Sequence, residues 1–111
     1  MRWLVFLVVV QTAWAQAPQG SVENGKKLYQ ANWCQSCHGT VGQGGDRGAG
    51  PKIAPNPFPY EAFAHQVRRP RSSMPRYPVD FVSDQQLADI YAYVSSIKAG
   101  PGAKDIPALR D

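Results

Sequence analysis

The stretch that decides the fold is Cys34-Gln35-Ser36-Cys37-His38, which reads C-x-x-C-H. It contains both cysteines of a chain of 111 residues, so the multi-bridge disulfide framework of small secreted proteins is excluded. A chain of this length forms one domain with a small core, which a bound metal or cofactor would stabilise considerably. The pentapeptide is therefore where such a group is expected to bind.

The C-x-x-C-H spacing is that of a covalent attachment site for haem c. The two thiols add to the two vinyl groups of the porphyrin, and the adjacent imidazole reaches the iron. A thioredoxin-like redox pair would need a βαβ scaffold, for which the chain has no strand pattern. A zinc site made of Cys34, Cys37, His38 and His65 is disfavoured, because neighbouring Cys37 and His38 do not easily point at one tetrahedral centre. We therefore predict one haem c per chain, with Cys34 and Cys37 as attachment points and His38 as the proximal axial ligand.

Three helices are predicted from capping residues and from apolar residues at helical spacing. The first begins at Val22 after a Ser21 cap, and its glycine suggests that another element approaches closely there. The second ends before Pro70. The third follows the Ser83–Gln86 capping box, with Lys98 in its final turn. The expected apolar faces are Gly25, Leu28, Tyr29 and Trp33 in the first helix, Tyr60, Phe63, Ala64 and Val67 in the second, and Leu87, Ile90, Tyr91, Val94 and Ile97 in the third.

Long loops separate these helices. Residues 39–50 include six glycines and residues 51–59 include four prolines, so neither segment suits a helix interior or a central strand. A dinucleotide-binding loop starting at Gly42 is disfavoured, because Arg47 occupies the place of the third glycine and no strand precedes it. The predicted fold is all-α, with short helices and long loops wrapped around one covalently bound haem.

These motifs together resemble class I (monohaem) c-type cytochromes over nearly the whole chain after residue 15. The Gly25/Tyr29 pair resembles the family's N-terminal helix, and residues 89–94 resemble the C-terminal helix that crosses it. Gly50-Pro51 resembles the segment whose backbone carbonyl orients the proximal imidazole. The resemblance implies a cytochrome c-like fold.

Met74, 36 residues after His38, resembles the family's distal Met-Pro element and is expected to be the second axial ligand. It lies in a polar, arginine-rich loop, which is a poor place for a methionine that merely fills a core. A thioether ligand raises the reduction potential and closes the iron to small substrates. His65 is the competing ligand, but the apolar face of its helix leaves it to one side, so a surface or structural role is favoured.

The N-terminus has the features of a secretory signal peptide. Arg2 precedes the apolar run 4–10, and Ala13-Trp14-Ala15 matches an A-x-A cleavage site. The run is too short to span a bilayer, which needs about 20 apolar residues. We expect residues 1–15 to be removed, residues 16–111 to form a cytochrome c domain (core 21–98, tail 99–111), and the mature chain to be periplasmic without a membrane span.

Net charge gives little information about partners. The chain carries +4, which falls to +3 without Arg2, and this excess is too dilute to indicate nucleic acid binding. Its placement is more informative, because four arginines bracket Met74. We predict a docking patch for an acidic redox partner at Arg68, Arg69, Arg71 and Arg76, with a solvated loop as the alternative. One of these arginines, or Lys52, could instead pair with a haem propionate.

The sequence therefore predicts an electron carrier with no catalytic residues, whose iron cycles between Fe(III) and Fe(II). A subunit of an exported dehydrogenase or oxidase complex is the main alternative, for which the tail could serve in docking. A haem enzyme or gas sensor would need an open sixth position, which Met74 disfavours.

Overall fold

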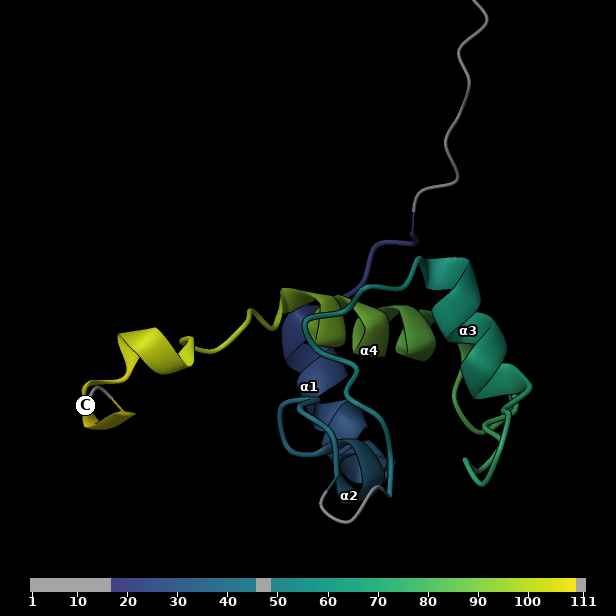
Figure 1. Ribbon diagram of the computed structural model, residues 1–111. Helices are drawn as coiled ribbons and strands as arrows, with labels where there is room; N and C mark the ends of the chain where they lie inside the picture. The colour runs from purple at the N-terminus through teal and green to yellow at the C-terminus, as the bar shows by residue number, and fades with distance from the viewer. Residues whose placement is uncertain (1–16, 46–48, 110–111) are drawn as a thin grey trace, which may run out of the picture.

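The structure is a computed structural model that describes residues 17–45 and 49–109 (Figure 1). Its four α-helices are α1 (Val22–Ala31), α2 (Cys34–His38), α3 (Tyr60–Arg68) and α4 (Asp84–Ser96). These residues contain no β-strand, and long loops join α2 to α3 and α3 to α4. The prediction of an all-α fold is therefore confirmed.

The first helix begins as predicted but ends earlier than its expected apolar face. The side chain of Ser21 accepts a hydrogen bond from the backbone N–H of Asn24 (3.1 Å), which caps the first turn. The helix stops at Ala31, and Trp33 adopts a left-handed backbone (φ 62°) that redirects the chain into α2. Its side chain is 72% exposed. Placing Trp33 on the apolar face of this helix was therefore wrong.

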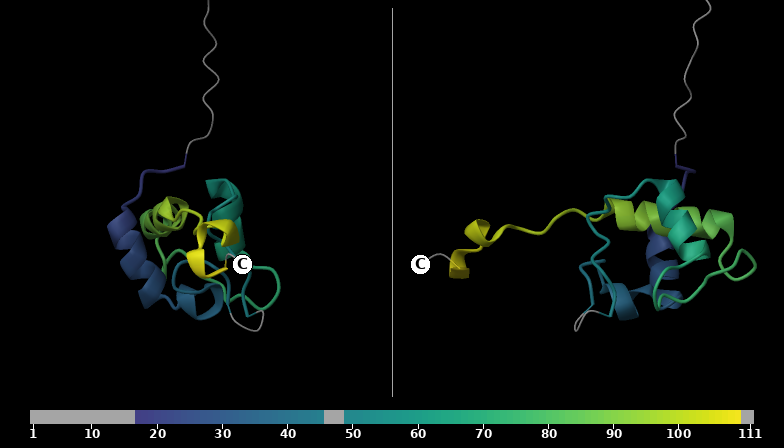
Figure 2. Two further views of the ribbon diagram at one scale, coloured as in Figure 1. Left: turned by 60° about the vertical axis from the view of Figure 1, so that its left-hand side comes forward. Right: turned by 45° about the vertical axis from the view of Figure 1, so that its right-hand side comes forward.

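The fold centres on the crossing of α1 and α4 (Figures 1 and 2). The expected close approach occurs at Gly25: a Cβ atom there would overlap the carbonyl group of Asp89 and lie 2.9 Å from the Cβ of Tyr93. One turn further along, the rings of Tyr29 and Tyr93 meet edge to face, with centroids 5.4 Å apart. Both tyrosines are buried in the core.

A buried carboxylate stabilises the same crossing of α1 and α4. Asp89 is 5% exposed and accepts hydrogen bonds from the backbone N–H of Ser21 (2.8 Å) and the side chains of Asn24 (2.7 Å) and Gln85 (3.0 Å). Burial raises the pKa of this carboxyl, but the three hydrogen bonds outweigh it and leave the pKa below its usual range. Asp89 therefore stays charged and joins the start of α1 to α4.

The last helix has the predicted capping box. The side chain of Ser83 accepts from the N–H of Gln86 (3.1 Å), and the Gln86 side chain accepts from the N–H of Ser83 (2.9 Å). The helix ends at Ser96, so Lys98 lies outside it rather than in its last turn. Ser96 Oγ donates to the carbonyl of Tyr93 (2.6 Å), a local bond of the kind that competes with helix continuation.

The helix α3 packs against α4 through aromatic rings. Tyr60 and Phe63 each place a ring centroid 5.2 Å from that of Tyr91, in edge-to-face geometry. The hydroxyl of Tyr91 also donates to the carbonyl of Phe58 (2.8 Å), just before α3. The predicted bounds of this helix are confirmed, because it ends two residues before Pro70.

Beyond α4 the chain leaves the helical body. Two short 3₁₀ helices, η2 (Ala103–Asp105) and η3 (Pro107–Leu109), lie apart from it, as the right-hand view of Figure 2 shows. The predicted signal segment 1–15 lies outside the described residues. Within the described ranges, every helix is too short or too polar to span a bilayer.

The crossing predicts a large penalty for a side chain at Gly25. Gly25→Ala should lower the free energy of unfolding by about 1–3 kcal/mol, because its Cβ must push Asp89 and Tyr93 away. Denaturant unfolding of the folded holoprotein measures this change. Gly100→Ala is the matched control, since a Cβ there meets nothing within 4 Å. Equal stability of the two variants would show that the helices do not cross this closely.

Candidate functional site

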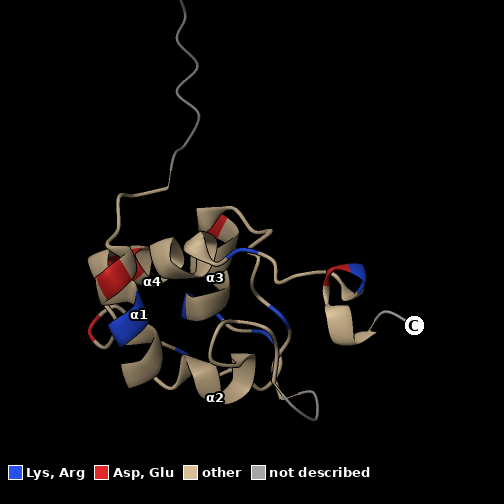
Figure 3. Cartoon of the chain, turned by 90° about the vertical axis from the view of Figure 1, so that its left-hand side faces the viewer, with Lys and Arg blue, Asp and Glu red and all other residues tan. Residues whose placement is uncertain are grey.

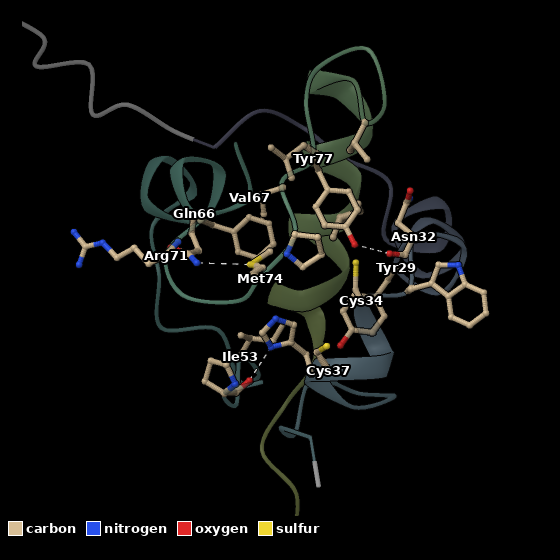
Figure 4. A pocket seen from close by; sticks show the side chains of 18 of the residues that line it. Tyr29, Asn32, Cys34, Cys37, Ile53, Gln66, Val67, Arg71, Met74 and Tyr77 are labelled. Carbon is tan, nitrogen blue, oxygen red and sulfur yellow. Dashed lines mark hydrogen bonds between the residues drawn. The ribbon is translucent and has the colours of Figure 1, made fainter. Parts of the chain in front are cut away.

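An apolar cavity of about 670 Å³ lies between the helices and the loops that join them (Figure 4). Cys34, Cys37, His38 and Met74, the four side chains predicted to hold a haem, all line it. Most of its wall is hydrocarbon, supplied by Ile53, Phe63, Val67, Val82, Leu87 and Ile90. The structure thus brings residues of all four α-helices and of the loops between them around one volume.

The short helix α2 aims three of these side chains in a common direction. Residues three and four apart lie on one face of a helix, so Cys34, Cys37 and His38 share the cavity side. The carbonyl of Trp33 accepts from both the N–H (3.0 Å) and the hydroxyl (2.6 Å) of Ser36, which stabilises the first turn. The five-residue helix therefore presents the two thiols and the imidazole as one unit.

The burial of Cys34 disfavours dithiol redox chemistry. Burial raises the pKa of Cys34 to about 11, whereas reactive redox cysteines have a lowered pKa. In the ranges 17–45 and 49–109, no three His, Cys, Asp or Glu side chains gather into a group that could hold a metal ion.

A backbone carbonyl orients the imidazole of His38. Its Nδ1 lies 2.8 Å from the carbonyl oxygen of Pro51, which can only accept, so Nδ1 carries the proton and Nε2 is left to bind a metal (Figure 4). Gly50 allows this contact, because a Cβ there would lie 2.9 Å from the carbonyl carbon of Cys37. The Gly50-Pro51 segment thus stands where the sequence resemblance placed it.

The loop between α3 and α4 carries Met74 to the cavity. Met74 is half-buried, and its sulfur lies near the cavity in Figure 4. The N–H of Tyr77 donates to the carbonyl of Val67 (3.2 Å), which closes the loop at its base. His65 also lines the cavity and is an exposed residue.

Arg68 is not part of an exposed patch, which corrects its place in the predicted docking surface. Only 18% of its side chain is exposed. Its guanidinium donates to the carbonyls of Tyr77 (2.9 Å) and Val82 (2.6 Å) and to the carboxylate of Asp84 (2.9 Å). A run of four arginines does not reveal that the first one points inward. The side chain joins α3, the end of the Met74 loop and the start of α4.

The other three arginines, Arg69, Arg71 and Arg76, are exposed. Arg71 also lines the cavity. Figure 3 shows that basic residues occur in several loops as well as on α1. The docking surface therefore stays a prediction for these three residues.

Three tyrosines and one glutamine near the site have contacts that the sequence did not predict. The hydroxyl of Tyr77 donates to the carbonyl of Asn32 (2.7 Å), and burial raises its pKa. The hydroxyls of Tyr29 and Tyr93 donate to carbonyls of the glycine-rich loop at residues 39 and 40. Gln66 donates to the sulfur of Met74 (3.6 Å). The helical spacing of Tyr29 predicted its burial, but no spacing pattern identified Tyr93 or any of these hydrogen-bond partners.

The residues present fit the predicted haem. The cavity is lined mainly by hydrocarbon, as cofactor sites usually are, and its size lies in their range. Two thiols, one oriented imidazole and one thioether are the donor set of a covalently attached haem with His and Met ligation.

Comparison with known proteins agrees with this chemistry. The family model described as "Cytochrome C oxidase, cbb3-type, subunit III" matches residues 20–94, about two thirds of the chain. The matched range contains all four cavity donors. No curated protein matches the sequence.

The contacts of Arg68 predict that it is required for stability. Arg68→Leu should lower the free energy of unfolding by about 2–3 kcal/mol, because two backbone carbonyls lose a charged donor. Arg69→Leu removes the same charge from an exposed neighbour and should change it by less than about 0.5 kcal/mol. Thermal or denaturant unfolding of both variants compares them. If Arg69→Leu were the more damaging change, the assigned orientations of the two side chains would be wrong.

Proposed function

Because the chain belongs to this family, and is thus a c-type cytochrome with one covalently bound haem, we propose that it is a class I electron carrier with His38 and Met74 as axial ligands. Haem-based electron transfer follows from the family. The specific ligand pair is supported by the single observation that both side chains line one apolar cavity with Cys34 and Cys37.

The residues of the chain have separate tasks in this proposal. Cys34 and Cys37 would hold the haem as thioethers, and the Pro51 carbonyl orients the His38 ring through Nδ1, which leaves Nε2 available to bind the iron. When bound, the haem supplies an Fe(III)/Fe(II) couple that takes one electron from a donor and passes it to an acceptor. The apolar wall excludes water and so favours the less charged ferrous state.

Met74 is the residue that supports a carrier over a haem enzyme or gas sensor. A thioether in the last axial position leaves no site for a substrate or gas to bind. His65, an exposed residue that also lines the cavity, is the competing ligand. The proposal therefore assigns no catalytic residue.

Membership of a larger complex is the second candidate, and the family description favours it. That family is described as a subunit of an oxidase. The tail after α4 lies apart from the helical body and is the segment available to contact a neighbouring subunit. Under either candidate the domain moves single electrons. The features of residues 1–15 support export and a periplasmic location.

We further propose that Arg69, Arg71 and Arg76 steer an acidic redox partner towards the cavity. All three are exposed and belong to the loop that carries Met74. Opposite charges on a partner would raise the encounter rate at low salt. Arg68 takes no part, because its charge is held by Asp84 and two carbonyls.

The ligand assignment predicts a spectroscopic change in Met74→Ala. The ferric wild-type protein should show the Met-to-iron charge-transfer band, and the variant should lose it because it has no thioether. A haem stain after denaturing electrophoresis is the control, and should remain in Met74→Ala but disappear when both cysteines are replaced by serine. A wild-type band that persists in Met74→Ala would assign the ligand elsewhere.

The docking proposal predicts a salt-dependent rate. Oxidation of the ferrous protein by the anion ferricyanide should slow severalfold as ionic strength rises from 10 to about 150 mM, as Coulomb attraction is screened. Arg69→Gln/Arg76→Gln should show a weaker salt dependence than Lys26→Gln/Lys27→Gln, which removes equal charge from exposed positions on α1. Identical profiles for the two double variants would exclude local steering by the loop.

A further inference from the structure

Gln66 contacts both Met74 and the loop that carries it. Its side-chain Nε2 donates to the Met74 sulfur at 3.6 Å (Figure 4), and its Oε1 accepts from the backbone N–H of Arg71 at 3.4 Å. Gln66 is half-buried and lines the cavity. One amide thus bridges the start of the loop and the thioether.

The two contacts fix which end of the amide faces the sulfur. The N–H of Arg71 can only donate, so it must face the oxygen Oε1. This leaves the NH₂ group towards Met74, whose thioether can only accept. The reversed amide would place two donors at Arg71 and an oxygen against the sulfur lone pairs, which is unfavourable.

The donor is held on a helix, whereas its acceptor is on a loop. The helix α3 is fixed by the rings that surround Tyr91 and by the contacts of Arg68 at its end. The loop is tied to α3 where Tyr77 bonds to Val67. Between these anchors, Gln66 is the side chain that reaches the sulfur through a hydrogen bond.

We propose that Gln66 is a positioning residue for Met74, which orients the thioether and lowers its electron donation to the metal. This inference rests on the proposed role of Met74 as a ligand. A thioether sulfur has two lone pairs, so one can accept the Gln66 hydrogen bond while the other binds iron. Withdrawing electron density from the sulfur favours the ferrous state and raises the reduction potential. The apolar wall strengthens the bond, because a hydrogen bond is electrostatically stronger in surroundings of low dielectric.

The test is Gln66→Leu in the haem-loaded protein, with Gln30→Leu as the matched control. Leucine keeps the volume and suits the apolar wall but cannot donate to sulfur. Gln30 is exposed on α1, and its side chain makes no hydrogen bond to the residues that the structure describes. In Gln66→Leu we expect the Met-to-iron band to persist, and the ferrous-to-ferric ratio at a fixed ambient potential to fall about fivefold, the effect of one ordinary hydrogen bond. Gln30→Leu should leave the ratio unchanged.

Other results have defined meanings. Loss of the band in Gln66→Leu, with haem retained, would also support positioning, since the thioether would have left the iron. The inference would be overturned if Gln66→Leu kept the Met-to-iron band and had the same reduction potential as Gln30→Leu, even if Gln66→Leu were less stable. Failure of the proposed function gives a different result: the Met-to-iron band would then remain in Met74→Ala.

A second measurement uses the wild-type protein, so it does not require that any variant folds. In NMR spectra of the ferrous protein, the side-chain NH₂ protons of Gln66 should show cross-relaxation with the methyl group of Met74. Their absence, with both groups assigned, would place the amide away from the sulfur and overturn the proposal.

Discussion

The close crossing of α1 and α4 at Gly25 is the constraint on which the other elements depend. Only a residue without a Cβ lets the backbone of α1 reach the carbonyl of Asp89, and the Asp89 carboxylate then secures the contact. The crossing fixes α1, and α2 follows it after only two residues. The other helix, α4, supports α3 through Tyr91. Both sides of the cavity therefore take their positions from one contact.

The two proposed axial ligands are supported in different ways. His38 belongs to a helix, and a glycine-rich segment brings Pro51 against its ring. Met74 belongs to a loop whose support comes from the last turn of α3, through Gln66, Val67 and Arg68. Local chain geometry thus determines the proximal side, whereas contacts between separate elements determine the distal side. The distal side is therefore the more adjustable of the two.

Local patterns in the sequence were sufficient to predict α1, α3 and α4, but not the five-residue helix α2. The Ser21 cap, the Ser83–Gln86 box and the stop before Pro70 depend on neighbouring residues, and all three occur in the structure. The close approach at Gly25 was predictable because a glycine inside a helix has an energetic cost that needs a reason. The four cavity donors were identified from the C-x-x-C-H spacing and the family resemblance, and the structure brings them to one volume.

The features that the sequence did not predict depend on the direction in which a side chain points, which the spacing of residues along the chain does not determine. Trp33 continued the apolar periodicity of the first helix in the sequence. In the structure Trp33 itself has a left-handed backbone conformation and lies outside the helix, and its side chain is exposed. Arg68 belonged to a run of positive charges, yet its side chain points inward, where its guanidinium donates to the carbonyls of Tyr77 and Val82.

The exposed indole of Trp33 has a practical consequence. Trp3 and Trp14 precede the predicted cleavage site, so the mature chain would contain a single tryptophan beside the attachment cysteine. Haem quenches indole emission at short range, so fluorescence from this one side chain would distinguish chains that carry a haem on α2 from chains that carry none.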